Sequence, residues 1–238
     1  MKTSIKLSST LWHRPQLWLL ISSVAVIMAA CSSESIDNDS LKTFPVAEAI
    51  DLGLPSGIKW ASWNVGASNP EEYGGYYAWG ETELKDYYDW STYIHCDGSQ
   101  ETCHYIGDDI AGTECDVAHV KWGGLWRTPT SEQLEELIEN CTIEWTQQNG
   151  VNGFRATGPN GNSIFLPAAG YRWYYLLDYD YLYEGSNGLF WSSSGLYWSS
   201  SYDPDNEDFA FGFVFNSDYW DWYYLSRYYG RSVRAVCP

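Results

Sequence analysis

Cysteine and histidine are the side chains of this 238-residue sequence that most often carry chemistry, and their spacing limits what they could do. None of the six cysteines forms a Cys-X-X-Cys pair, and the four histidines add no zinc-ligand spacing. His95 precedes Cys96 and His104 follows Cys103, but adjacent residues on an extended chain point to opposite faces. The sequence therefore predicts no zinc site and no Cys–His nucleophile at these positions.

A short acidic run, DPDNED at residues 203–208, provides oxygen ligands of the kind that calcium prefers. Asp203, Asp205 and Glu207 lie at alternate positions, as in a calcium loop. The EPN-like and WND-like signatures of calcium-dependent lectins are missing, and a solvated turn starting at Pro204 explains the run equally well. We therefore expect no required cofactor and keep calcium as an alternative at these three carboxylates.

Aromatic side chains are the most unusual feature, and most of the 20 tyrosines lie between residues 171 and 230. The runs WYYLLDYDYLY (173–183) and DYWDWYYLSRYY (218–229) place aromatics on consecutive positions, which no strand or helix can bury on one face. Many of these rings must be exposed, and a contiguous exposed aromatic patch marks a binding surface. The candidate ligand-binding residues are Trp173, Tyr174, Tyr175, Tyr179, Tyr181, Tyr183, Tyr219, Tyr223, Tyr224, Arg227, Tyr228 and Tyr229.

Arg227 is the only basic residue between positions 173 and 230. We expect its guanidinium to stack among the surrounding tyrosines and to keep hydrogen-bond donors free for a ligand. The alternative is a surface ion pair with Asp218 or Asp221. The stacked tyrosines would be Tyr223, Tyr224, Tyr228 and Tyr229.

The N-terminus predicts an export signal and a lipid anchor. A basic start is followed by an apolar run at residues 17–30, which is too short for a permanent membrane helix but typical of a signal peptide. The run ends at Ala30-Cys31, which resembles the lipobox of bacterial lipoproteins. We therefore expect a signal peptide at 1–30, lipidation of Cys31, and a flexible acidic tether at 31–45.

Charge limits the partners that the chain can bind. The formal net charge is -18, and because the signal segment carries only basic charges, the chain without it is more acidic still. This field repels phosphate backbones, so nucleic acid is excluded as the expected partner. The expected location is the outer membrane, and Ser32–Ser40 is either a surface-export signal or a spacer.

From residue 46 onward the sequence predicts short strands, turns and one clear helix. Thr130 is a good N-cap, and Gln133 completes a capping box. An apolar stripe then follows at helical spacing, with glutamates between its members, so one face of the helix should pack on a core. The stripe consists of Leu134, Leu137, Ile138 and Cys141.

Strand signals follow the helix. Residues 142–146, 151–157 and 163–166 predict strands, joined by turns at Asn149-Gly150 and Asn160-Gly161. Alternating phenylalanines at 209–215 predict a strand with an aromatic inner face, and Ser232–Cys237 predicts the last strand. A tandem repeat, GLFWSSS (188–194) and GLYWSSS (195–201), predicts a duplicated hairpin edge or an enlarged loop.

Six blocks in one order resemble a known family. They are IDLGLPSGIKWASWNVGA (50–67), YYAWGE (76–81), AHVKWGGLWRTPT (118–130), NGNSIFLPAAGYR (160–172), GSNGLFWSSS (185–194) and GRSVRAVC (230–237). They are similar to the Fibrobacter succinogenes major paralogous domain of Bacteroidetes surface lipoproteins. The resemblance implies an α+β, C-type-lectin-like domain over 46–238, with a small twisted antiparallel sheet, one or two helices and long aromatic-rich loops.

The pattern is also similar to the variable proteins of diversity-generating retroelements, whose Tyr, Asp, Asn and Ser codons are mutagenised. Under that interpretation the tryptophans are fixed framework residues. They are Trp191, Trp198, Trp220 and Trp222.

The resemblances imply a surface-displayed lipoprotein whose aromatic loops bind a glycan or a protein. The alternative is a structural subunit of a surface assembly. A third hypothesis, an enzyme like the formylglycine-generating enzyme, needs a placed cysteine pair that the sequence does not supply, so we expect no enzyme. In this fold the termini come near the helix, which predicts a Cys141–Cys237 disulfide, with Cys96 joined to Cys103 or Cys115.

Overall fold

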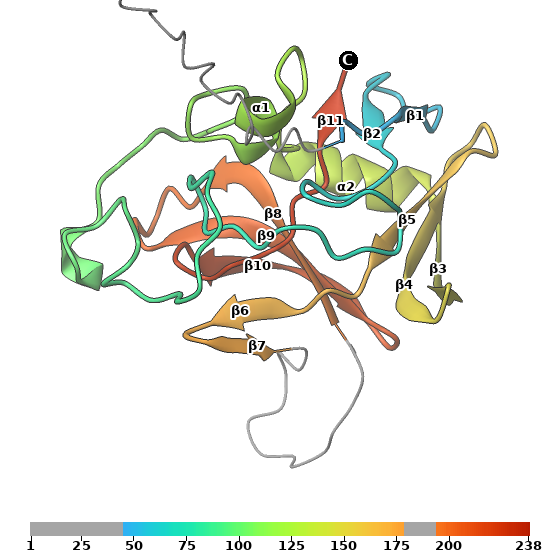
Figure 1. Cartoon of the computed structure of the whole chain (residues 1–238). Coiled ribbons are helices and arrows are strands. Elements are labelled where there is room, and N and C mark those ends of the chain that lie inside the picture. Colours follow the sequence, from blue (N-terminus) through green and yellow to red (C-terminus); the bar gives the residue numbers. More distant parts are fainter. Residues whose placement is uncertain (1–44, 179–193) are drawn as a thin grey trace, which may run out of the picture. The chain divides into compact units, whose positions relative to one another are not determined.

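The computed structural model describes residues 45–178 and 194–238, which belong to one compact unit beginning at Lys42. This unit is mostly β, with three antiparallel sheets of three strands, one two-stranded sheet and two short α-helices (Figure 1). The predicted signal peptide, Cys31 and nearly all of the tether lie outside the described residues. So do Tyr179, Tyr181 and Tyr183 of the predicted binding set.

The first sheet joins the two ends of the domain. Its strands are β1 (Ala49–Asp51), β2 (Lys59–Ala61) and β11 (Val236–Cys237), in the order β1-β2-β11. Trp60, fully buried on the middle strand, pairs with Ile50 on one side and Val236 on the other. The last strand is shorter than predicted because residues 231 and 232 form single bridges to Tyr77 and Tyr197 instead of a continuous ladder.

The predicted helix is confirmed as α2 (Ser131–Asn140). The Thr130 hydroxyl accepts a hydrogen bond from the Gln133 backbone amide, and the Gln133 side-chain oxygen accepts one from the Thr130 backbone amide, as a capping box requires. Leu134, Leu137 and Ile138 are buried. The shorter helix α1 (Val117–Trp122) begins at Asp116, and a 3-10 turn, η1, covers Gln100–Thr102.

The predicted meander after α2 is also confirmed. Strands β3 (Thr142–Gln148), β4 (Val151–Thr157) and β5 (Ser163–Pro167) pair in sequence order. Asn149 and Gly150 both have positive φ, 51° and 84°, which a tight two-residue hairpin turn requires. The sheet therefore follows from local signals in the sequence.

The central sheet contains β8 (Ser194–Tyr202), β9 (Phe209–Asn216) and β10 (Trp220–Ser226), with β9 in the middle. Its two faces contact two different core clusters. Phe213 and Phe215 face the cluster that contains the α2 stripe, whereas Ala210 and Val214 face the cluster around Trp79. The prediction of a single aromatic inner face is therefore wrong in part, because the alternate face of β9 is buried as well.

The remaining strands form a small hairpin, β6 (Tyr171–Trp173) and β7 (Leu176–Asp178). Residue 172 bridges to Gly230, and residue 174 bridges to Tyr88. The second copy of the tandem repeat forms β8, whereas the first copy lies outside the described residues apart from Ser194. Figure 1 shows β6 and β7 below the central sheet and α2 above it.

Three arginines near the C-terminus are buried, although the chain as a whole is acidic. Arg234 donates to the Asn64 Oδ1 (2.8 Å), the Ala61 carbonyl (3.0 Å) and the Phe165 carbonyl (2.8 Å). Burial lowers the pKa of Arg234 to about 10. The guanidinium thus links β2, β5 and the C-terminal segment through neutral acceptors. The other two buried arginines are Arg227 and Arg231.

The cysteines differ from the prediction. Cys96 and Cys103 form a disulfide, which confirms one of the two partners expected for Cys96, but Cys141 and Cys237 are free. Cys141 packs against the α2 core cluster, and Val236 is part of that same cluster. Because adjacent strand residues point to opposite faces, Cys237 points away from Cys141. The predicted Cys141–Cys237 bridge is therefore wrong; Cys115 is also free.

Candidate ligand-binding surface

Aromatic side chains from β9 and β10 form a ladder on one face of the central sheet. In the antiparallel register Trp220 lies opposite Phe215, Trp222 opposite Phe213, and residue 224 opposite residue 211. Cross-strand aromatic pairs of this kind stabilise a hairpin. On β9 the ladder is covered at Phe213 and Phe215 by the α2 core cluster, whereas on the neighbouring edge strand β10 its rings are only partly covered.

The β10 side of the ladder is partly exposed to solvent. Trp220 is 43% exposed and Tyr224 is 52% exposed, while Trp222 and Phe211 are half-buried beside them. The Phe211 and Trp222 rings stack at 5.7 Å and 18°, and the Tyr224 ring meets Phe211 edge-on at 5.5 Å. These four residues, Phe211, Trp220, Trp222 and Tyr224, are called the aromatic platform below. Neighbouring rings fix its geometry, so it would lose little side-chain entropy on contact with a ligand.

Other predicted binding residues lie in the core instead of on this surface. Tyr223 alternates with Trp222 and Tyr224 on β10, so its ring points to the opposite face and packs against the cluster around Trp79. Tyr228 is buried and packs against Trp90 at 4.6 Å between ring centres. Trp173, Tyr219 and Tyr229 are half-buried. Consecutive aromatics are therefore divided between two cores and the surface.

The prediction for Arg227 is wrong in its surroundings. Its side chain is fully buried, and its charge lies over the rings of Trp79 (5.0 Å), Tyr93 (5.3 Å) and Tyr202 (5.8 Å). Its three guanidinium nitrogens donate to the Tyr93 hydroxyl, the Glu207 carbonyl and the His104 carbonyl. These donors are not free for a ligand. Cation–π stacking was expected correctly, but the rings are not those of the neighbouring tyrosines: Trp79, Tyr93 and the His104 carbonyl come from a segment far away in sequence, and the others come from residues 202 and 207.

A second exposed aromatic group combines the β6–β7 hairpin with the segment before residue 90. Tyr174 is 39% exposed and Tyr175 is 75% exposed. Their rings lie 5.5 Å and 4.5 Å from the ring of Tyr87. The three residues Tyr87, Tyr174 and Tyr175 are called the tyrosine cluster below. Two of them are in the predicted set, and Tyr87 was not foreseen because its contact is non-local.

The acidic run 203–208 forms a turn between β8 and β9. Asp203 is buried and accepts a hydrogen bond from the Asp205 amide at 3.0 Å, and Asn206 caps the amide of Asp208. Over residues 45–178 and 194–238, no three His, Cys, Asp or Glu side chains gather as metal ligands would. Asp203, Asp205 and Glu207 therefore form no calcium cluster in the described part of the chain.

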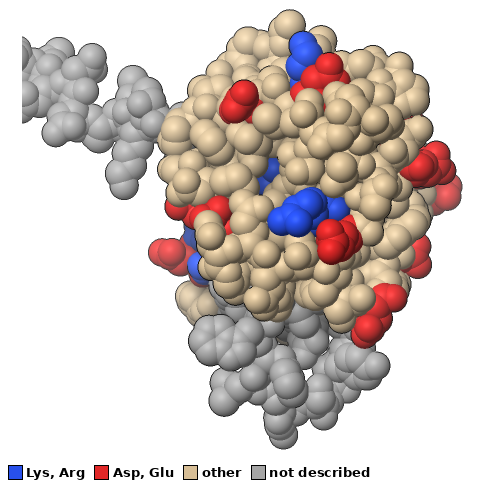
Figure 2. All heavy atoms as spheres, turned by 90° about the vertical axis from the view of Figure 1, so that its right-hand side faces the viewer, with Lys and Arg blue, Asp and Glu red and all other residues tan. Residues whose placement is uncertain are grey.

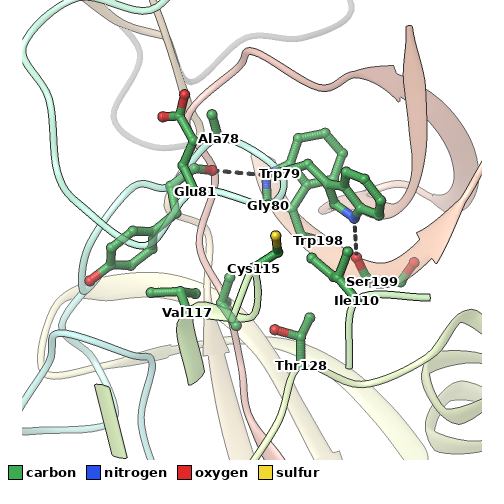
Figure 3. Close-up of a pocket in the computed structure, with 12 residues that line it drawn as sticks. Ala78, Trp79, Gly80, Glu81, Ile110, Cys115, Val117, Thr128, Trp198 and Ser199 are labelled. Carbon is green, nitrogen blue, oxygen red and sulfur yellow. Dashed lines mark hydrogen bonds between the residues drawn. The ribbon is translucent and has the colours of Figure 1, made fainter. Parts of the chain in front are cut away.

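A small void lies beside β8 of the central sheet, between residues 77–81 and the start of α1, and its volume is about 10 Å³ (Figure 3). The indole nitrogens of Trp79 and Trp198 donate to the carbonyls of Ser199 (3.1 Å) and Tyr77 (2.9 Å) across it. Burial and the charge of Glu114 raise the pKa of the nearby Cys115 thiol. The void has room for about one water molecule, so it is a packing defect and not a ligand site.

Charge is spread thinly over the described surface. Figure 2 shows isolated acidic groups around one face and a few basic side chains nearer its centre, separated by uncharged residues. No helix in the part of the chain that the structure describes has the length and apolarity needed to span a membrane.

Sequence reasoning missed the role of Trp220 and Trp222, which it treated as framework under the retroelement interpretation. The signal was nonetheless present, because Trp220, Trp222 and Tyr224 alternate with period two, opposite the alternating phenylalanines of 209–215. A short turn at residues 216–219 brings the two rows onto one face.

The chain matches no protein-family model, no curated protein and no solved structure.

Proposed function

We propose that this chain is a surface-displayed lipoprotein with a C-type-lectin-like domain, and that the aromatic platform binds a glycan or a protein. The observation that carries this proposal is the partial exposure of Trp220 and Tyr224 on the edge strand β10, beside buried aromatic residues of β9. Large aromatic side chains are usually buried, and aromatic anchors in rigid surroundings are typical of binding hot spots. The resemblance to the major paralogous domain supports the same function.

The platform offers enough area for specific binding. A large aromatic side chain buries about 150–250 Å² when it is fully covered. Covering the exposed halves of Trp220 and Tyr224 would therefore remove about 200 Å² from water, worth about 5 kcal/mol before the cost of association. Aromatic faces stack on sugar rings and also anchor protein interfaces, so both ligand classes stay within the proposal.

The first experiment tests the platform. We expect the double variant Trp220→Ala/Tyr224→Ala to lose at least tenfold in affinity for whatever ligand a glycan array or a native-membrane pull-down identifies. The matched control is Tyr105→Ala, because Tyr105 is similarly exposed (57%) but lies on a different segment. Unchanged binding by the double variant, with its thermal midpoint preserved, would contradict the proposal.

The second experiment tests display. Cys31 follows the apolar N-terminal run, so Cys31→Ala should abolish acyl labelling and release the chain from the membrane fraction. A Cys141→Ala variant controls for the loss of a thiol, since Cys141 is also free. Labelling that persists in the Cys31 variant would refute the anchor.

One observation favours the alternative of a structural subunit. Strand β10 lies at the edge of the central sheet and pairs only with β9 in that sheet. Such an edge can accept a strand from a sister subunit. Chemical cross-linking in intact cells distinguishes the hypotheses: a product that joins β10 to another surface protein supports assembly, and its absence together with glycan binding supports recognition.

A further inference from the structure

A surface pocket lies beside the tyrosine cluster. Its volume is about 220 Å³, and it is lined by residues 74–76, by residues 84–86, by Tyr88 and by Arg172 of β6. The apolar part of its wall is Leu84, which is 55% exposed. This volume is below the range of about 300–1,000 Å³ that is typical of pockets for drug-sized ligands. The pocket therefore fits a single ring and not a long side chain or a large cofactor.

Arg172 is the distinctive side chain of the pocket. Its backbone exchanges two hydrogen bonds with Gly230 (2.8 and 3.0 Å), and its guanidinium carbon lies 5.2 Å from the centre of the Tyr76 ring. Among residues 45–178 and 194–238, no hydrogen bond or ion pair occupies its guanidinium nitrogens. The Arg172 guanidinium thus lies over the Tyr76 ring, and within the described residues its N–H groups have no hydrogen-bond acceptor.

The second cation of the pocket is already used within the fold. Lys85 makes an ion pair with Glu81 at 2.8 Å and donates to the Thr92 carbonyl at 3.1 Å. Asp86, by contrast, is exposed at the pocket wall. The pocket therefore offers one available guanidinium and one available carboxylate.

Strain in the adjacent backbone marks the same place. Tyr174 has a φ of 51°, a left-handed conformation that is uncommon for a bulky residue. Two backbone hydrogen bonds to Tyr88, at 2.9 and 3.1 Å, hold it there. Strained non-glycine residues persist where the surrounding structure over-determines them, and they cluster at ligand sites. At Tyr174 the chain turns from β6 into β7, and the exposed rings of Tyr174 and Tyr175 lie at this turn.

We propose that this pocket is a subsite for a uronic acid residue of an acidic glycan, with its carboxylate on Arg172 and the neighbouring sugar rings on Tyr174 and Tyr175. A planar guanidinium binds a carboxylate through two parallel hydrogen bonds. Asp86 then accepts hydrogen bonds from sugar hydroxyls. The inference rests on the proposed binding function, but it uses a different surface from the aromatic platform.

The charges favour a sugar acid over other anions. An acidic peptide would bring a carboxylate against Asp86, whereas a uronic acid offers hydroxyl donors there together with one carboxylate. The net charge of -18 does not prevent this contact, because the screening length is about 8 Å at physiological salt and the local guanidinium dominates within it.

The experiment compares uronate tetramers with neutral versions of themselves. Tetragalacturonate and tetramannuronate are titrated into the protein by calorimetry, in parallel with their methyl esters, which remove the charge but keep the rings. EDTA is present throughout, so calcium bridging is excluded. We expect at least one acid to bind tenfold or more tightly than its ester, and Arg172→Gln to abolish this preference.

The matched control is Arg155→Gln. Arg155 is also half-buried, lines another pocket, of about 160 Å³, and has no hydrogen-bond or ion-pair partner among the described residues. The Arg155 variant should keep the preference for the acid. Arg172→Lys, which keeps the charge but not the planar fork, should retain only part of it, and equal thermal midpoints exclude misfolding as the cause.

Several results would overturn the inference. Equal affinity for acid and ester, no binding of either tetramer, an unchanged preference in Arg172→Gln, or tighter binding of a glutamate-rich peptide would each do so. These outcomes are distinguishable from failure of the proposed function. If a ligand still depends on Trp220 and Tyr224 while uronate shows no preference, only the inference about the Arg172 pocket fails.

Discussion

Raising the pH from about 9 toward 12 should destabilise this domain steeply and then unfold it cooperatively, because its core contains tyrosines that resist ionisation while folded. Four of them, all about 1% exposed, have raised pKa values caused mainly by burial. The pKa rises to about 12 for Tyr88 and for Tyr197, and that of Tyr77 and Tyr93 is also well above the usual value.

The sign follows from proton binding in the two states. Above pH 10 an unfolded tyrosine loses its proton, whereas these folded tyrosines keep theirs, so the folded state binds more protons and stability falls as pH rises. At about pH 11 ionisation favours the unfolded chain by about 1.4 kcal/mol for each such tyrosine. Arg234 acts in the opposite direction, because its lowered pKa lets the folded state lose a proton first, and it offsets about one tyrosine.

The net loss is therefore about 4 kcal/mol at about pH 11, and it grows toward pH 12. Domains of this size are stable by about 5–15 kcal/mol in total, so the loss brings this one close to its unfolding midpoint. Far-ultraviolet circular dichroism follows the fold, and tyrosinate absorbance follows ionisation. Both signals should change together above pH 10 in one transition that reverses on return to neutral pH.

The matched variant is Tyr88→Phe, which removes one titrating hydroxyl together with its hydrogen bond to the Tyr76 carbonyl (2.7 Å). It should lower stability at pH 7, because the lost hydrogen bond costs about 1 kcal/mol. Above pH 10, unfolding of the variant should release about one proton fewer, so its stability should fall less steeply with pH. The exposed Tyr175→Phe variant should change neither quantity. Complete tyrosine ionisation near pH 10 with an intact circular dichroism spectrum would refute this reasoning, because it would mean that the four hydroxyls are accessible to solvent.

Three further predictions concern stability at neutral pH. Thr130→Ala should cost about 1 kcal/mol in chemical denaturation because α2 loses its N-cap, and Thr130→Ser should restore most of it. Asp116→Ala should cost about 3–5 kcal/mol, since this buried carboxylate accepts hydrogen bonds from four donors, two of them on Thr128 (2.9 and 2.6 Å); a loss below 1 kcal/mol would contradict its bridging role. Replacing Cys96 and Cys103 by serine opens a loop with a sequence separation of 7 and should lower the unfolding free energy by about 2 kcal/mol, whereas reductant alone should have no effect on that variant.

Local signals were enough to predict much of the fold from the sequence. The capping box at Thr130, the apolar stripe of α2 and the Asn149-Gly150 turn each involve residues within a few positions of one another. Propensity and periodicity describe such interactions well. The strands of the meander and the alternating β9 belong to the same class and are confirmed as strands, although the burial of both faces of β9 was not predicted.

Contacts between distant segments could not be predicted in this way. Arg227 is buried by Tyr93 and His104, more than 120 positions earlier, and nothing around Arg227 in the sequence shows this cover. The Cys141–Cys237 prediction failed for a related reason: it placed both thiols on inner faces, whereas the pairing of β11 with β2 assigns the inner position to Val236. A register difference of one residue moves a strand side chain to the opposite face.

The division of the aromatic residues follows from the same physics. A strand in a sheet covered on both sides buries both its even and its odd positions, so a dense aromatic sequence does not by itself produce an exposed patch. Exposure differs between the two strands: the α2 core cluster covers Phe213 and Phe215 on β9, whereas Trp220 and Tyr224 on the edge strand β10 are about half exposed. The same rings that stabilise the β9–β10 pair therefore present a rigid surface on the edge strand. Because the outer rings are only partly buried, changes to them should affect binding more than folding, whereas changes to Phe213 or Phe215 should affect both.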